Sequence, residues 1–238
     1  MKKRFVSLVL AVCLIACLEL VGCNKDPKIQ SGGTYKIHSY VPETVKVGDE
    51  EYEYSLGGVV TIGEKGSYLS FAASYGNKQF SSVKIDNAYN CFDVVSSNVV
   101  WIDSLVKNTG DGLPTNYAYW VVLVRETEEN LIEDVNLDGE YTPSAKSKVS
   151  ASYENIKSFS VSGDKVTVDG TECTLVDGKK FSYTVKYSTG GMVNNEYILT
   201  VNAEFLEANA DGITLVTKIL YSDGSLHRIH VFRMTPNA

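Results

Sequence analysis

Residue types that commonly carry catalytic or metal chemistry are scarce in this sequence. It has three histidines, and its five cysteines form no Cys-x-x-Cys pair. It also lacks a His-Glu-x-x-His motif, a Gly-x-Ser-x-Gly nucleophile turn and a glycine-rich phosphate loop. Carboxylates are plentiful, but no two of them stand out as the acid and base of a glycosidase. We therefore expect a protein that is not an enzyme.

Positive charge is also in short supply, with 22 Lys and Arg against 29 Asp and Glu. Residues 1–22 carry three of the basic residues and one of the acidic ones, so the remainder of the chain has a net charge of −9. Such a surface repels the phosphates of nucleic acids and of lipid headgroups. We expect no nucleic-acid partner, and membrane attachment would need an anchor other than surface charge.

Only one long apolar run is present, in residues 5–18, directly after Lys2, Lys3 and Arg4. It is shorter than the ~20 residues of a transmembrane helix. A basic start, a short apolar core and small residues at its end are typical of a secretory signal peptide. The sequence therefore predicts that residues 1–22 are a leader for export.

The residues that end this leader, Leu-Val-Gly-Cys at positions 20–23, resemble the lipobox of bacterial lipoproteins. The resemblance implies cleavage before Cys23, acylation of Cys23, and a membrane-anchored envelope protein that faces the extracytoplasmic side. Leu-Ile-Ala-Cys, ending at Cys17, is an alternative lipobox. Cys23 is favoured because residues 23–33 continue as a polar tether with glycines at its end.

Two cysteines, Cys91 and Cys173, lie in the rest of the chain. Outside the cytoplasm such a pair can oxidise to a disulfide. Their separation in the sequence does not show whether they meet. A disulfide and two separate buried thiols both remain open.

Alternating apolar and polar residues predict an all-β domain over residues 34–238. The clearest cases are residues 181–187 and 196–205, in which every second side chain is apolar. Pairs of Gly, Asp and Asn between such segments are typical of hairpin turns and predict an antiparallel meander over residues 157–234. Residues 117–125 are apolar on both faces, which predicts a central strand. Residues 126–154 lack the periodicity of a strand or a helix and are expected to form a long irregular connection.

The start and end of this domain resemble bacterial lipocalin-like lipoproteins. The start is "GGTYKIHSYVPETVKVGDEEYEYSLGG" followed by "VVTIGEKGSYLSF", and the end is "ILYSDGSLHRIHVFRM". The resemblance implies a lipocalin-like β-barrel, and a β-sandwich is the alternative. It also places Gly33 and Tyr35 at a Gly-x-Trp position and Arg233 near the end of the barrel. Arg233 would then lie over the ring of Tyr35 where the first and last strands meet.

One loop has the opening pattern of a calcium site, D-x-[DN]-x-[DN]-G, in residues 134–139. Asp134, Asn136, Asp138 and the carbonyl of Glu140 are the candidate ligands. Ala145 replaces the usual bidentate Glu, so a carboxylate from elsewhere would have to complete the site. An ordinary acidic turn without calcium is the alternative.

The function that these features favour is non-catalytic binding at the cell envelope. A barrel interior would suit a small apolar or amphipathic ligand, or the protein would mediate contacts. Fifteen tyrosines and two tryptophans also fit an alternative, a carbohydrate-binding or adhesin-type module with an exposed aromatic strip and possible calcium stabilisation.

Overall fold

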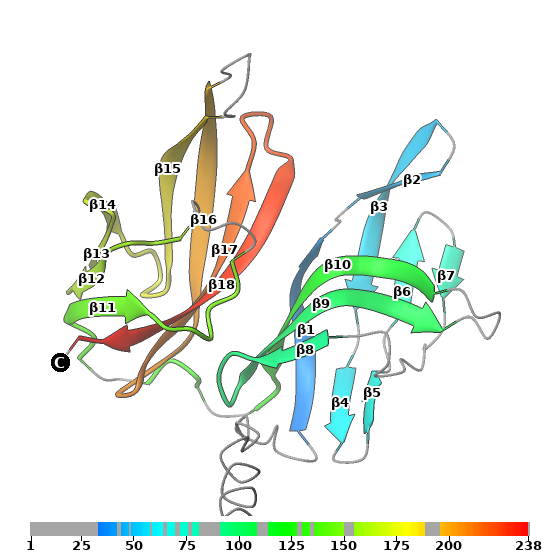
Figure 1. The fold of residues 1–238 in the computed structure, drawn as a ribbon, viewed down its shortest axis with the longest axis horizontal. Coiled ribbons are helices and arrows are strands. Elements are labelled where there is room, and N and C mark those ends of the chain that lie inside the picture. Colours follow the sequence, from blue (N-terminus) through cyan, green and yellow to red (C-terminus); the bar gives the residue numbers. More distant parts are fainter. Residues whose placement is uncertain are drawn as a thin grey trace, which may run out of the picture.

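The computed structural model describes residues 33–41, 44–47, 49–57, 59–63, 66–69, 72–75, 78–80, 91–108, 114–127, 130–133, 136–149, 155–188 and 196–237. All regular elements in these ranges are β-strands, which form two neighbouring bodies (Figure 1). Within the same ranges, no helix is long and apolar enough to cross a bilayer.

The first body contains a six-stranded antiparallel sheet with β10 near its centre. The order is β5 (Gly66–Leu69), β4 (Val59–Gly63), β1 (Gly33–Val41), β10 (Pro114–Arg125), β9 (Val99–Asn108) and β8 (Cys91–Val94). A second sheet joins β2 (Thr44–Val47), β3 (Glu50–Gly57), β6 (Ala72–Tyr75) and β7 (Lys78–Phe80). Val121, Val122 and Leu123 of β10 are all fully buried, which confirms the central strand predicted for residues 117–125.

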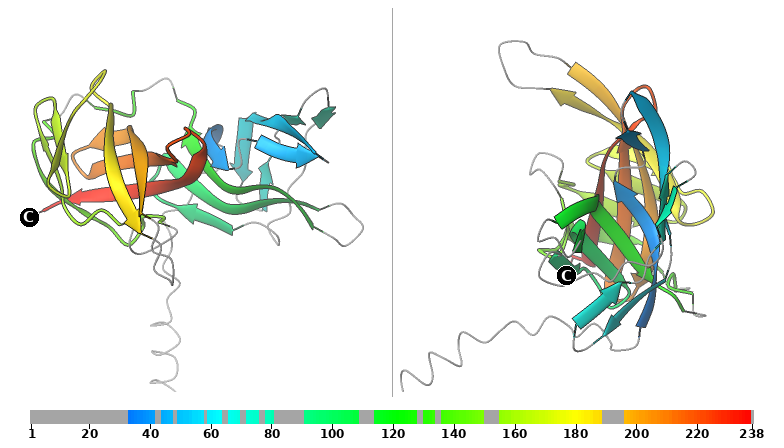
Figure 2. Two further views of the ribbon diagram at one scale, coloured as in Figure 1. Left: turned by 90° about the horizontal axis from the view of Figure 1, so that it is seen from above. Right: turned by 90° about the vertical axis from the view of Figure 1, so that its right-hand side faces the viewer.

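The second body is a nearly closed eight-stranded antiparallel barrel, which confirms the prediction of an all-β fold with an antiparallel barrel. Its strands run in chain order around the axis, and the last one pairs with the first (Figures 1 and 2). The meander predicted for residues 157–234 is confirmed. The strands are β11 (Gly139–Pro143), β12 (Phe159–Ser162), β13 (Lys165–Val168), β14 (Thr171–Thr174), β15 (Lys180–Ser188), β16 (Glu196–Asn209), β17 (Gly212–Leu220) and β18 (Leu226–Pro236).

The barrel is open along one seam, between β14 and β15. These are the two edge strands of the eight-stranded sheet. The segment between them folds into a tight turn in which Val176 and Lys180 form an isolated bridge. The side chains of the two strands still meet around the core, so the sheet curls into a barrel without a continuous ladder.

Two expectations about the barrel need correction. The barrel begins at β11, inside the stretch that was expected to lack regular structure. The sequence did not predict this strand because β11 is short and mostly exposed, and therefore shows no alternation of apolar and polar residues. In addition, Arg233 does not meet Tyr35. β1 pairs with β10, so Tyr35 lies opposite Arg125, whereas β18 pairs with β17 and β11. Each body thus joins its own first and last strands.

The two bodies share one hydrophobic cluster, which we call the joint. The indole of Trp101, a member of this cluster, stacks on that of Trp120, with ring centroids 6.2 Å apart. Its buried members come from β8–β9 and β10 on one side, and from the outer face of β16–β18 on the other. They are Val95, Val99, Trp101, Val122, Leu206, Val216, Ile229 and Val231.

Candidate functional site

The interior of the barrel is solid at one end. Phe181 and Phe205 pack edge to face with ring centroids 5.9 Å apart, and Phe159 contacts both of them. Val161, Val166, Ile213 and Met234 fill the space around these rings. These packed side chains form the floor of the other end.

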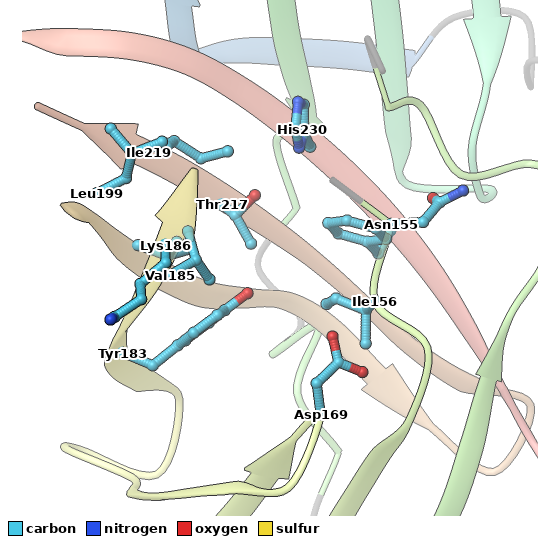
Figure 3. A pocket seen from close by; sticks show the side chains of 12 residues that line it. Asn155, Ile156, Asp169, Tyr183, Val185, Lys186, Leu199, Thr217, Ile219 and His230 are labelled. Atoms are coloured by element: carbon cyan, nitrogen blue, oxygen red, sulfur yellow. The ribbon is translucent and has the colours of Figure 1, made fainter. Parts of the chain in front are cut away.

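The opposite end of the interior is hollow, with a cavity of about 100 Å³ that we call the barrel pocket (Figure 3). Inward rows of β15, β16, β17 and β18 form its wall, and residues 155–156 and Asp169 form another side. Most of the wall is apolar, including Val185, Leu199, Val201, Ile219 and Phe232. Asn155 and Lys186 also line the pocket and are exposed, so it reaches the surface.

Thr217 is the most informative polar group in the barrel pocket. It projects from β17 into the pocket, and only 1% of the residue is exposed (Figure 3). Its Oγ1 atom is buried and has no hydrogen-bond partner in the part of the chain that the structure describes. A buried hydroxyl without a partner is costly and uncommon in folded proteins, so this oxygen suggests a missing polar group.

Tyr183 and His230 add polar atoms beside Thr217. The Tyr183 ring extends from β15 into the pocket (Figure 3). Burial, and to a lesser degree the carboxylate of Asp169, raise the pKa of Tyr183 far above its usual range. Its hydroxyl therefore stays protonated and can donate a hydrogen bond. His230 is buried on β18, directly opposite Thr217 in the strand register.

Asp169 shapes one side of the pocket through its backbone and its side chain. Asp169 and Gly170 both have positive φ, as a two-residue hairpin turn between β13 and β14 requires. Oδ1 of Asp169 accepts hydrogen bonds from the amides of Lys157 and Ser158, each 2.8 Å long. These bonds hold the segment that contains Ile156 against the barrel.

Two larger pockets lie outside the barrel, where the bodies meet. One, of about 270 Å³, lies beside His38, Glu204 and Lys218. The other, of about 480 Å³, lies beside Ser96, Glu207 and Arg233. Their polar groups already pair within the chain: Glu204 lies 3.6 Å from His38, and Glu207 accepts a hydrogen bond from Asn98. The barrel pocket is the better candidate because its polar group is unsatisfied.

The residues of the expected calcium loop take part in ordinary hydrogen bonds. Asn136 accepts from the amide of Asp138, and Asp138 accepts from the amide of Gly163 at 2.6 Å. The carbonyl of Glu140 accepts from the amide of Asn237. Asp134 lies outside the described residues. Among those that are described, no group of three or more His, Cys, Asp or Glu residues is arranged to hold a metal. The calcium site stays a prediction.

The other sequence-predicted residues are scattered. Cys17 and Cys23 lie outside the described residues. Cys173 is a buried free thiol in β14, and burial raises its pKa. The side chain of Cys91 lies outside the described part of the chain. Arg233 donates to Thr214 and lies 3.8 Å from Glu207.

The sequence predicted two strand faces that line the barrel pocket, but not the pocket itself. Tyr183, Val185, Leu199 and Val201 were placed on the apolar faces of their strands, and they do face inward. Thr217 was missed. The sequence signal that could have identified Thr217 is that it is the polar residue in an otherwise apolar inward row of β17. The other residues of this row are Ile213, Leu215 and Ile219.

No family model, no curated protein and no solved structure matches this chain. The chemistry of the pocket therefore has to be inferred from the residues themselves.

Proposed function

We propose that this chain is a non-catalytic lipoprotein of the bacterial cell envelope, anchored through an acylated Cys23, whose barrel binds a small apolar or amphipathic ligand. The observation that carries the binding proposal is the barrel pocket, with its apolar wall and the unpaired Oγ1 of Thr217. The lipobox-like residues 20–23 carry the proposal of the anchor.

The size of the pocket limits the ligand. An apolar cavity of ~150 Å³ is large enough for benzene, so about 100 Å³ accepts only one end of most organic molecules. The rest of the ligand would extend toward the surface. Tyr197 is the next residue of the inward row of β16 beyond Leu199, and it is exposed. Its ring offers an apolar surface for the protruding part.

Native mass spectrometry of protein purified from its own host tests this function. We expect a small molecule to remain bound to the natural protein and to be lost in Val185→Trp, because an indole at this inward position fills the pocket. Thr184→Trp is the matched control, since Thr184 is the preceding residue of β15 and points outward.

The control variant should keep the bound molecule. A protein that carries no molecule in either form would contradict the binding proposal. So would a molecule retained by Val185→Trp. The same spectra report the mass of the amino-terminal peptide, and an unmodified Cys23 on an intact leader would contradict the anchor.

A further inference from the structure

The most deeply buried residues of the barrel pocket include two polar ones. Its deep part contains polar atoms, since Thr217 and His230 are each only 1% exposed. Farther along β15, β16 and β17 the wall is apolar, at Val185, Leu199 and Ile219. The exposed polar side chains of Asn155, Asp169 and Lys186 line other parts of the pocket. An amphiphile that inserted its polar end first would bring that end to Thr217 and leave its apolar part against Val185, Leu199 and Ile219.

The charges around the pocket disfavour an anionic head. Asp169 lines the pocket, and its carboxylate acts on Tyr183 strongly enough to help raise the pKa of that hydroxyl. Lys186 also lines the pocket, but its side chain is 74% exposed and its ammonium group lies 3.2 Å from Glu196. A carboxylate head would therefore meet a like charge without a buried lysine to offset it.

The hydroxyl of Thr217 suits a neutral group because it can both donate and accept a hydrogen bond. Tyr183 can donate a second one, since its hydroxyl stays protonated. An alcohol, phenol or amide would satisfy the buried oxygen of Thr217 without bringing a charge into the interior.

We propose that the barrel pocket recognises an uncharged hydroxyl or amide compound, which enters polar end first and hydrogen-bonds Oγ1 of Thr217. This inference rests on the proposed binding function and adds the chemical class and the orientation of the ligand.

Three small probes of related shape test it: phenol, toluene and benzoate. Phenol and toluene differ by a hydroxyl in place of a methyl group, and benzoate brings a negative charge. Binding of each probe to the purified protein is measured by titration calorimetry or by amide NMR shifts. We expect phenol to bind at least about tenfold more tightly than benzoate, and more tightly than toluene.

Two variants assign the difference to one oxygen. Thr217→Val keeps the shape of the side chain and should weaken phenol about tenfold, while toluene binds as well as before or better. Thr200→Val is the matched control, because Thr200 lies on the outward row of β16 between Leu199 and Val201. It should leave all three affinities unchanged.

The outcomes separate this inference from the function on which it rests. If toluene binds as well as phenol, or if Thr217→Val leaves phenol binding intact, the polar-end-first inference is overturned and the binding function stands. Equal binding of benzoate would overturn the neutral-ligand part. If none of the probes binds at millimolar concentration, or if Val185→Trp binds them as well as the natural protein does, the binding function itself fails.

Discussion

At the scale of single residues, two buried threonines of β17 differ in whether their hydroxyls have hydrogen-bond partners. Thr214 and Thr217 are both fully buried. Thr214 accepts a hydrogen bond from Arg233 at 3.1 Å and lies 3.4 Å from a carboxylate oxygen of Glu207. Thr217 has no such partner within the described residues. The first hydroxyl is bonded to other side chains of the protein, and the second lines the barrel pocket.

This contrast predicts opposite effects for the same substitution. Thr217→Val should stabilise the ligand-free protein by ~1 kcal/mol, because it removes a buried group that pays for desolvation without a bond. Thr214→Val should destabilise it by ~1–3 kcal/mol, because Arg233 and Glu207 lose their shared partner. Urea denaturation of the two variants measures both changes. Equal losses of stability in both would show that Thr217 is satisfied in the folded protein.

At the scale of elements, β16 contains a bulge that the sequence did not reveal. The register with β17 shifts between Phe205 and Glu207, so two residues of β16 face one of β17. Leu206 then turns toward the joint, and Glu207 becomes buried beside Arg233. Asn98, from the turn between β8 and β9, donates to Glu207 across the two bodies. The bulge thus brings a buried charge pair to the joint.

Because Arg233 and Glu207 form a buried charge pair, we expect the effects of substituting them on folding stability to be strongly non-additive. Arg233→Met should cost ~3 kcal/mol, because Glu207 would keep its charge in a buried position without a cation. Adding Glu207→Gln should recover a large part of that loss, since the amide can still bond to Thr214 and Asn98. Chemical denaturation of both single variants and the double variant measures the coupling. Additive losses would mean that the pair does not interact across its 3.8 Å separation.

The same element shows where sequence reasoning succeeds and where it stops. Residues 196–205 alternate strictly, so the inward positions of Leu199, Val201, Ala203 and Phe205 followed from the two-residue period of a strand. The bulge changes that period after Phe205, and no local turn residue marks it. β11 was missed because a strand of five residues with one buried side chain has no readable pattern. The pocket was not predictable because its volume depends on how several strands pack together.

At the scale of the whole molecule, the contact between the two bodies includes a titratable group. His38 of β1 lies against β16, with Nε2 3.6 Å from Glu204. Burial is the main reason that the pKa of His38 lies below its usual value; Glu204 acts in the opposite direction, and Lys218, Lys179 and Lys180 reinforce the lowering. The protonated form of His38 is thus less stable in the folded protein than in the unfolded chain.

This shift predicts how stability depends on pH. Because the pKa of His38 is lower in the folded state, the unfolded chain binds the proton more readily, and stability falls as the pH drops through ~6.5 and below. We expect the free energy of unfolding, compared with that of His38→Gln, to decrease between pH 8 and pH 5.5. Denaturation of both proteins across this range measures the difference. A difference that grows toward low pH would mean that Glu204 outweighs burial.

The seam between β14 and β15, where no main-chain ladder joins the strands, allows the circumference of the barrel to change. Elsewhere around the barrel, widening would break main-chain hydrogen bonds between neighbouring strands. Separating β14 from β15 would break no such ladder. β15 carries Tyr183 and Val185, so a small outward swing of this one strand would enlarge the chamber they help to bound. Opening of the seam would then increase the volume of the barrel pocket beyond the about 100 Å³ of this structure.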